Sequence, residues 1–328
     1  MQRKLIFIIF AAVLSGNRMQ GQDVFFSQFF MHKIYLNPAF SGYDDESHLL
    51  LNYRNQWPDL SGSFVSYGVA YDQPLKKLHG GMGAYLMNDV QGKGISNHLT
   101  AGLIYSYRIK VTRYSFAHAA LQAGAGQYAL HAGRLQFADM FDPVTNDFSY
   151  SSSDGTGNQS ILYPDFAAGV LYHFWDRYSN SVFYLGAGAS HLLQPSLAGG
   201  LTLYRKYTGH LGVNFPFVYN RLGFEEIRLY PVVLFQMQKN FNILSYGTSI
   251  IGDRYFIWTG FRHNLDLNFF TPVIAAGMHQ PMYSLVYSYD YMPSRKDMAV
   301  SGYGAHEITL LLNFRYRSKI KAIKCPKI

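Results

Sequence analysis

The stretch Gln280-Pro-Met-Tyr-Ser-Leu-Val-Tyr-Ser-Tyr-Asp-Tyr291 alternates between two kinds of side chain. The large, mostly aromatic set is Tyr283, Leu285, Tyr287, Tyr289 and Tyr291, and the small, mostly polar set is Ser284, Val286, Ser288 and Asp290. Successive side chains of a β-strand point to opposite faces. The stretch is therefore predicted to be a strand with one tyrosine-rich apolar face and one polar face. A single strand of this kind also suits a soluble sandwich, so the fold class depends on the rest of the chain.

The same alternation recurs along the chain, in segments that turn-forming residues separate. Val65, Tyr67, Val69 and Tyr71, for example, alternate with Ser66, Gly68, Ala70 and Asp72. Strands are predicted near residues 47–55, 63–72, 79–88, 96–109, 115–129, 164–174, 181–190, 203–214, 226–238, 241–251, 253–262, 269–278, 281–291 and 304–317. Their even number is typical of single-chain bacterial membrane barrels. The predicted fold is all-β: a single transmembrane antiparallel β-barrel of about 14 strands over residues 47–317, with an N-terminal plug-like segment.

The composition favours a membrane barrel over a soluble protein. Aromatic residues make up 17% of the chain and charged residues only 15%, whereas soluble domains average about 25% charged residues. The 27 Tyr and 25 Phe could supply the aromatic girdles of a barrel. Beyond the first apolar block, no run approaches the roughly 18 apolar residues of a membrane helix.

The amino-terminal residues are typical of a secretory signal. Met1-Gln-Arg-Lys precedes an apolar block, Leu5 to Leu14, and small Gly21 follows a polar stretch. Residues 1–21 are therefore predicted to be a cleaved signal peptide; the block is too short for an uncleaved anchor. Cleavage would lower the net charge from +8 to +5, a modest surplus that does not indicate a nucleic-acid partner. Cys325 is the single Cys, so no internal disulfide is expected.

Residues 22–46 form a segment of their own, rich in aromatic residues but broken by Asn37-Pro38 and Ser41-Gly42. Proline restricts both itself and its predecessor, so the segment is not one continuous strand. So much aromatic surface is not expected to remain in water. We therefore expect a plug in the periplasmic mouth of the barrel; the alternative is a disordered leader. The expected plug residues are Phe25, Phe26, Phe29, Phe30, Tyr35, Asn37 and Pro38.

The two rims of the predicted barrel differ in charge. With the amino terminus on the periplasmic side, connections alternate between the faces, and the long ones, above all residues 130–163, fall outside. The inner turns are basic, with Lys76, Lys77, Lys110 and Arg113, and a basic tail, residues 318–328, adds Lys319, Lys321 and Lys324. A basic rim suits anionic lipid head groups, and it also suits docking of an acidic periplasmic partner. At the outer rim, Asn55, Gln56 and Trp57 are candidate partner contacts, although Trp57 also suits an ordinary girdle position.

Motifs for catalysis, metal binding and nucleotide binding are missing. The sequence contains no H-E-x-x-H, C-x-x-C, G-x-S-x-G or phosphate-binding G-x-x-x-x-G-K-[ST] pattern. The 12 His residues are scattered rather than placed at ligand spacing. We expect a non-enzymatic protein with no cofactor and no metal. Spacing alone does not exclude a barrel hydrolase with Ser and His on neighbouring strands.

Several blocks together resemble one family. They are Phe26-Ser-Gln-Phe, Tyr35-Leu-Asn-Pro-Ala-Phe-Ser-Gly, Tyr53-Arg-Asn-Gln-Trp-Pro, Gly81-Met-Gly-Ala-Tyr-Leu-Met-Asn-Asp, Tyr105-Ser-Tyr-Arg, Ser190-His-Leu-Leu followed by Pro195, Tyr287-Ser-Tyr-Asp-Tyr and His306-Glu-Ile. In this order they resemble the PorP/SprF outer-membrane proteins of Bacteroidetes, over nearly the whole mature chain. The Asn-Pro-Ala and Tyr-Arg-Asn-Gln-Trp blocks are the specific ones.

The resemblance, and not the periodicity, implies a role in type IX protein secretion. It implies an outer-membrane barrel that supports gliding motility or export of cell-surface proteins. Its partners would be outer-membrane lipid, other secretion components, a periplasmic protein, and a secreted adhesin or its C-terminal domain. The family supplies no catalytic residues to carry over. The alternative, which the residues leave open, is an outer-membrane channel or transporter for hydrophobic or small solutes, with residues 22–46 as its gate.

Overall fold

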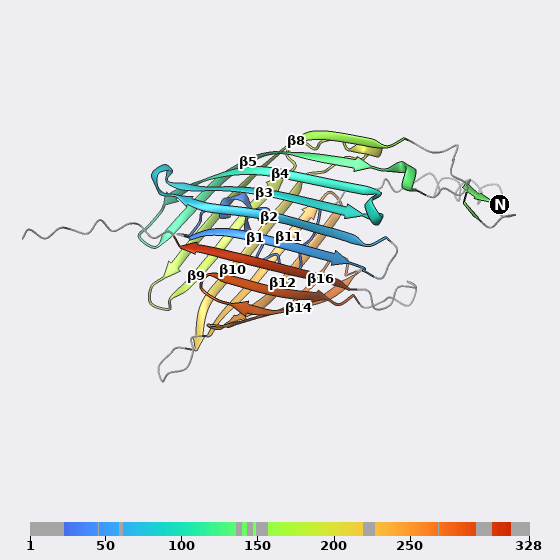
Figure 1. Ribbon diagram of the computed structural model, residues 1–328. Helices are drawn as coiled ribbons and strands as arrows, with labels where there is room; N and C mark the ends of the chain where they lie inside the picture. The colour runs from blue at the N-terminus through green and yellow to red at the C-terminus, as the bar shows by residue number, and fades with distance from the viewer. Residues whose placement is uncertain are drawn as a thin grey trace, which may run out of the picture.

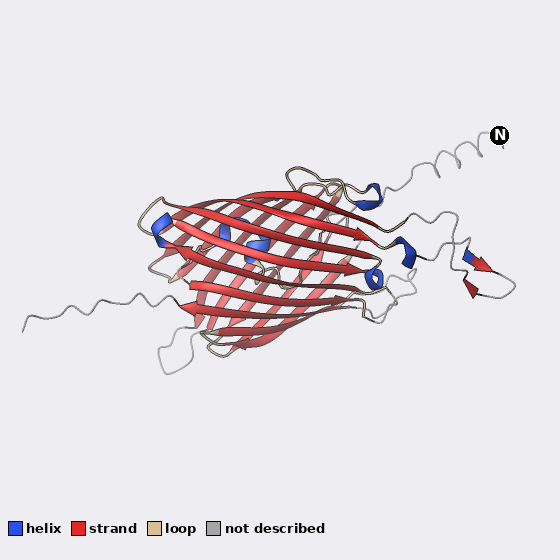
Figure 2. Ribbon diagram, turned by 45° about the horizontal axis from the view of Figure 1, so that its top comes forward, coloured by secondary structure: helices blue, strands red, loops and turns tan. Residues whose placement is uncertain are grey.

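The protein is a closed β-barrel whose lumen is occupied by its own amino-terminal segment (Figures 1 and 2). The computed structural model describes residues 23–44, 46–58, 62–135, 140–142, 147–148, 157–218, 227–267, 269–292 and 304–315. In this part of the chain, no helix has the length and apolar character needed to cross a membrane.

Fourteen antiparallel strands close the barrel, as the sequence predicts. They are β1 (Glu46–Gln56), β2 (Phe64–Leu75), β3 (Gly80–Gln91), β4 (Ser96–Lys110), β5 (Ser115–Leu130), β8 (Gln159–Asp176), β9 (Ser181–Ser190), β10 (Lys206–Val218), β11 (Ile227–Gln238), β12 (Phe241–Ile251), β13 (Tyr255–His263), β14 (Phe270–His279), β15 (Tyr283–Asp290) and β16 (Ala305–Arg315). Each strand pairs with its neighbours in the chain, and β1 pairs with β16 from Glu46↔Arg315 to Gln56↔Ala305. Two short strands, β6 (Phe141–Asp142) and β7 (Asp147–Phe148), form a separate sheet.

The start of strand β8 differs clearly from the prediction, which places it at Pro164. Strand β8 begins five residues earlier, at Gln159, and pairs with β5 from there onward. Pairing of β8 with β9 begins only at Ala168, so β8 has a partner on one side at Pro164. A proline lacks the N–H donor, and a strand edge without a partner tolerates that loss. Proline therefore does not mark a strand boundary here.

The two ends of the barrel differ in their connections. At the short-turn end, strands are joined through residues 76–79, 111–114, 177–180, 219–226, 252–254 and 280–282, and β1 starts there. At the long-connection end lie residues 57–63, 131–158, 191–205 and 291–304, together with shorter turns. Long loops on the outer side and short periplasmic turns are typical of bacterial outer-membrane barrels.

Burial follows the alternation of residues in the sequence. In β15, Leu285 and Tyr287 are 44% and 45% exposed, whereas Ser288 and Asp290 are completely buried. On β4, Leu103 is 69% exposed and its neighbour Ile104 is buried. The predicted outward sets therefore form the outer surface. The inward sets pack against residues 23–44 and against each other.

Candidate functional site: the plugged lumen and its rims

Residues 23–44, which we call the plug, run through the whole length of the barrel. Asp23 contacts His191 and Lys206 at the long-connection end, and Gly42 contacts Asp72 and Gly81 near the short-turn end. The prediction of a plug confined to the periplasmic mouth was therefore too short. The reason is that polar and aromatic plug residues find partners on the wall at every level of the lumen. Figure 2 shows short helical turns inside the barrel, visible between the strands.

The breaks in the plug sequence correspond to changes of backbone direction. A single turn of α-helix, α2 (Lys33–Leu36), ends at Asn37, and a 3₁₀ turn, η1 (Pro38–Phe40), follows. Proline at the first position of a helical turn is favourable because that N–H has no helical partner. The Asn37 side chain caps η1 by accepting a hydrogen bond of 3.0 Å from Ala39 N. Asn37 and Pro38 therefore convert an extended chain into a compact fold inside the lumen.

Asn37 also fixes the plug to the barrel wall. Its Nδ2 donates to the carbonyls of Val170 and Ala187 at 2.9 and 3.2 Å and lies 3.0 Å from His210 Nε2. These partners lie on β8, β9 and β10. The wall opposite Asn37 needs glycine: a Cβ on Gly186 would lie 2.9 Å from Asn37 Nδ2.

A second close approach occurs near the short-turn end, where two glycine backbones touch. A Cβ on Gly81 would lie 2.5 Å from Gly42 Cα, too close for any side chain. Gly42 has φ of +59°, a left-handed conformation that favours glycine. The Ser-Gly pair at the end of the plug and the glycine-rich start of β3 therefore fit together.

The acid Glu307 on β16 binds the amino-terminal half of the plug. It accepts hydrogen bonds from Ser27 N at 2.7 Å and Gln28 N at 3.4 Å, and His32 Nε2 lies 3.4 Å away. Gln28 Nε2 in turn donates to Ser288 Oγ at 3.1 Å. Gln28 and Glu307 are completely buried.

The charge of Glu307 is balanced by arginines on the wall. Arg54 on β1 pairs with Glu307 at 3.1 Å and with Asp290 on β15 at 3.0 Å. Arg262 on β13 pairs with Asp290 at 3.4 Å and donates to the carbonyl of Phe26 at 3.1 Å. Two carboxylates thus face two guanidinium groups. Buried charges persist in proteins when they are paired and hydrogen-bonded in this way.

A second buried ionic cluster holds the start of the plug. Asp23 accepts from His191 Nε2 at 2.8 Å and also binds Lys206 Nζ. The other ring nitrogen of His191 lies 3.0 Å from Asp165 Oδ2 on β8. The amide of Asp23 donates to Gln238 Oε1 at 3.2 Å. The plug is therefore joined to β8, β10 and β11 and to the residue after β9 at the long-connection end.

The aromatic residues predicted for the plug are mostly buried, against the barrel wall or against other plug residues. The ring centroid of Phe30 lies 4.5 Å from that of Trp258, and Phe29 meets Trp258 at 5.6 Å. Phe26 stacks on His32 and meets Tyr35, and Phe25 is half-buried against Phe241. All seven predicted plug residues therefore contact the barrel wall or each other.

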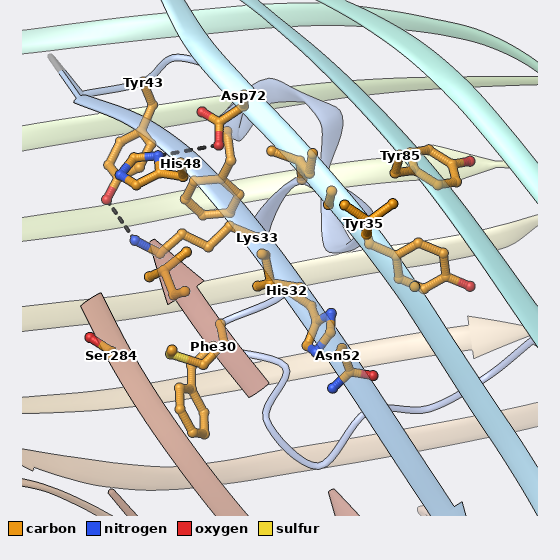
Figure 3. Close-up of a pocket in the computed structure, with 18 of the residues that line it drawn as sticks. Phe30, His32, Lys33, Tyr35, Tyr43, His48, Asn52, Asp72, Tyr85 and Ser284 are labelled. Atoms are coloured by element: carbon orange, nitrogen blue, oxygen red, sulfur yellow. Dashed lines mark hydrogen bonds and ion pairs between the residues drawn. The ribbon is translucent and has the colours of Figure 1, made fainter. Parts of the chain in front are cut away.

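A cavity of about 220 Å³ remains between the plug and the wall. Its apolar lining includes Phe30, Ile34, Leu50, Tyr85 and Phe256. Figure 3 shows this lining together with polar residues at one side, where Lys33 points to Tyr43 and His48 points to Asp72.

The predicted outer edge lies at the long-connection end, at the end of β1. Asn55, Gln56 and Trp57 are half-buried there. The Trp57 ring packs edge-on against Phe64 at 5.2 Å, and its Nε1 donates to Met292 Sδ. Arg54 points into the lumen and donates to Gln56 Oε1 at 3.3 Å.

The predicted basic rim lies at the short-turn end. Lys76 and Lys77 are exposed in the 3₁₀ turn η2 (Lys76–Leu78) between β2 and β3. Lys110 and Arg113 are exposed at the next such turn, between β4 and β5. The fold therefore brings these four residues to one end. Lys319, Lys321 and Lys324 lie outside the described residues, as do residues 1–21.

The wall partners of the plug are not among the residues predicted from the sequence; they are Asp165, His191, Lys206, Arg262, Asp290 and Glu307. A signal for several of them exists: they are charged residues at the inward positions of alternating strands. Inward charges in a barrel need either water or a partner. In the described part of the chain, no group of three His, Cys, Asp or Glu residues is placed to hold a metal ion.

Comparison with known proteins gives one family. The model of the type IX secretion system membrane protein PorP/SprF matches residues 18–312. A comparison with curated proteins gives no significant match.

Solved structures similar to this chain include several barrels at 9% sequence identity. The Ralstonia pickettii toluene transporter TbuX has a TM-score of 0.48, and 87% of this chain and 93% of that chain are covered. The TodX deltaS2S3 mutant, a monoaromatic hydrocarbon channel, has a TM-score of 0.49 with 86% and 94% covered. A Pseudomonas aeruginosa FadL homologue has a TM-score of 0.45 with 86% and 93% covered. Likeness at this level says nothing about what this chain binds.

Proposed function

Because this chain belongs to the PorP/SprF family of type IX secretion system membrane proteins, we propose that it is a non-enzymatic outer-membrane accessory of type IX secretion. It would engage an exported cell-surface protein, such as an adhesin or its C-terminal domain, or periplasmic components of the machine. Support of gliding motility is part of the same proposal.

The proposed layout follows from the sequence and the barrel. Residues 1–21 act as a signal peptide that is removed on export, residues 22–46 form the plug segment, and residues 47–317 form the barrel. Residues 318–328 form a basic tail on the periplasmic side. The short-turn end then faces the periplasm and the long-connection end faces the exterior.

The observation that carries the proposed mode of action is the filled lumen. The plug is bound to the wall through Asp23, Ser27, Gln28 and Asn37, at successive levels of the barrel. A barrel filled in this way offers its rims, rather than its interior, to other proteins. We therefore place partner contacts at the basic rim and at the edge formed by Asn55, Gln56 and Trp57.

The basic rim is the better candidate for the periplasmic partner. An outer-membrane protein has no access to ATP or to the inner-membrane proton gradient, so work must reach it through periplasmic proteins. Each exposed ion pair contributes only about 0–1 kcal/mol. A cluster of lysines can still steer and orient an acidic partner, and the effect fades as salt rises.

Co-purification from native membranes tests this proposal. One variant lacks residues 318–328 and carries Lys76→Glu and Lys77→Glu; a second carries Trp57→Ala. The first should lose periplasmic secretion components while keeping a folded barrel. If it retains them at both low and high salt, the rim is a lipid contact and the docking proposal is wrong. If Trp57→Ala leaves secretion and folding unchanged, the outer edge is not a partner contact.

The second candidate function is a channel or transporter for hydrophobic or small solutes. The apolar cavity beside the plug favours it. Such a protein would have to move the plug to open a path, and its loss should impair solute uptake while sparing secretion.

A further inference from the structure

The cavity beside the plug has an apolar body and a polar end. The body lies between plug residues Phe30 and Ile34 and wall residues Leu50, Tyr85 and Met87. The cavity extends toward the short-turn end, where Ile251 and His279, the last residues of β12 and β14, line it. At about 220 Å³ it exceeds the roughly 150 Å³ of an engineered apolar cavity that takes up benzene.

The polar end contains one cation whose charge is not matched by an ion pair. Lys33 Nζ donates to Tyr43 Oη at 2.7 Å and lies 4.7 Å from the centre of that ring. Among the described residues, no carboxylate lies within ion-pair distance of Lys33. Figure 3 shows the ammonium group beside Tyr43, with Phe30 and Ser284 on other sides of the cavity.

The nearby acids are already engaged by other groups. Asp72 accepts from Gly42 N at 2.9 Å, and its other oxygen lies 3.2 Å from His48 Nδ1. Asp44 lies 3.6 Å from the second nitrogen of the same imidazole. His48 therefore lies between the two carboxylates and balances at most one of their two negative charges. Lys33 remains as the group that suits an anionic oxygen, with the ring of Tyr43 beside it.

We propose that this cavity binds a single-chain anionic amphiphile of the fatty-acid class. The carboxylate would lie against Lys33 and Tyr43 at the polar end, and the chain would extend among Phe30, Ile34 and Leu50. The chain gains from removal of apolar surface from water, and the lysine supplies a charge-assisted hydrogen bond to the head.

The test uses the whole purified barrel in lipid nanodiscs. Laurate, dodecanol and dodecyltrimethylammonium share one tail and differ in the charge of the head. Binding is measured by competition against a fluorescent fatty acid, for the wild type and for Lys33→Met and Lys110→Met. Lys110 is an exposed lysine at the same end of the barrel and serves as the control. Folding of each variant is checked by heat-modifiable mobility.

Laurate should bind the wild type best of the three, and Lys33→Met should weaken it about tenfold, as expected for loss of one charge-assisted hydrogen bond. Dodecanol should bind the wild type and Lys33→Met with equal affinity. Laurate should bind Lys110→Met as tightly as it binds the wild type. Ala70→Phe, which fills the cavity from β2, should abolish binding of laurate and dodecanol, whereas the outward Ala101→Phe should not.

Equal laurate affinity in the wild type and Lys33→Met would overturn the proposal. A second measurement on the wild type does not depend on folding of any variant. Laurate that carries a photoreactive diazirine in its chain should label peptides containing Phe30, Ile34 or Leu50. Labelling confined to lipid-facing residues such as Leu103 would mean that the chain stays in the membrane, and the proposal would be wrong.

Discussion

Arg54 and Glu307 are directly paired residues of β1 and β16, the strands that close the barrel, and their side chains meet at 3.1 Å inside the lumen. Glu307 also accepts the amide of Ser27, so one carboxylate joins the closing seam to the plug. Both charged side chains are almost completely buried. The stability of the barrel and the position of the plug are therefore coupled at this point.

Substitution of Arg54 should destabilise the barrel strongly. Arg54→Met leaves Glu307 and Asp290 with one guanidinium between them, and loss of one partner of a buried pair costs about 3–5 kcal/mol. The exposed Arg113→Met should change the free energy of unfolding by less than about 0.5 kcal/mol. Urea unfolding in lipid vesicles, followed by heat-modifiable mobility, measures both. Equal midpoints for the two variants would show that the buried pair does not hold the structure.

On the lipid-facing side of β4, the free-energy cost of a charged side chain should depend on its depth in the bilayer. Leu103 lies at the middle of the strand, and Ile109 lies on the same face next to the short-turn end. Leu103→Arg should cost about 2–4 kcal/mol and Ile109→Arg about 0–1 kcal/mol. Unfolding of both variants in the same vesicles gives the comparison. A larger cost at Ile109 would place the bilayer elsewhere on the barrel.

The position of the plug can be tested by a disulfide. A Cβ built on Gly83 lies 3.5 Å from the Cβ of Ser41, within the range of a disulfide bond. In a Cys325→Ser background, Ser41→Cys with Gly83→Cys should form a cross-link in native membranes, which a gel-mobility shift lost on reduction reports. The control pairs Ser41→Cys with Met82→Cys, which is on the opposite face of β3. Cross-linking of the control pair but not of the test pair would contradict the described course of the plug.

Deletion of the plug should open the barrel. The structure fills the lumen with residues 23–44, so a variant without residues 22–44 should show larger and more frequent single-channel conductance than the wild type. Planar-bilayer recordings with both proteins measure this. An unchanged, closed barrel would mean that other parts of the chain block the lumen.

The strands were predictable because each depends on a local pattern. The alternation of Leu285 and Tyr287 with Ser284 and Ser288 repeats every two residues, and β4 and β13 show a similar alternation of exposed and buried residues. The basic rim was predictable for a related reason, since strand order alone decides at which end a turn lies. Lys76 and Lys110 therefore came together as expected.

The course of the plug was not predictable, because its contacts join residues very far apart. Ser27 binds Glu307 across 280 positions, and Asn37 binds Ala187 across 150. The two-residue alternation within a strand says nothing about contacts between residues so far apart in the sequence. The start of β8 was also misplaced: the strand was predicted from Pro164 but begins at Gln159, and the missing second partner at that point lets a proline lie within the strand.

If this chain serves type IX secretion, its loss should impair the export of surface proteins, which can be measured in cells. Quantitative mass spectrometry of surface and periplasmic fractions would compare a strain lacking this chain with the same strain carrying the gene restored. Exported surface proteins should be lost from the surface and should accumulate in the periplasm until the gene is restored. Unchanged export, together with reduced uptake of hydrophobic solutes, would contradict this role and identify the barrel as a transporter.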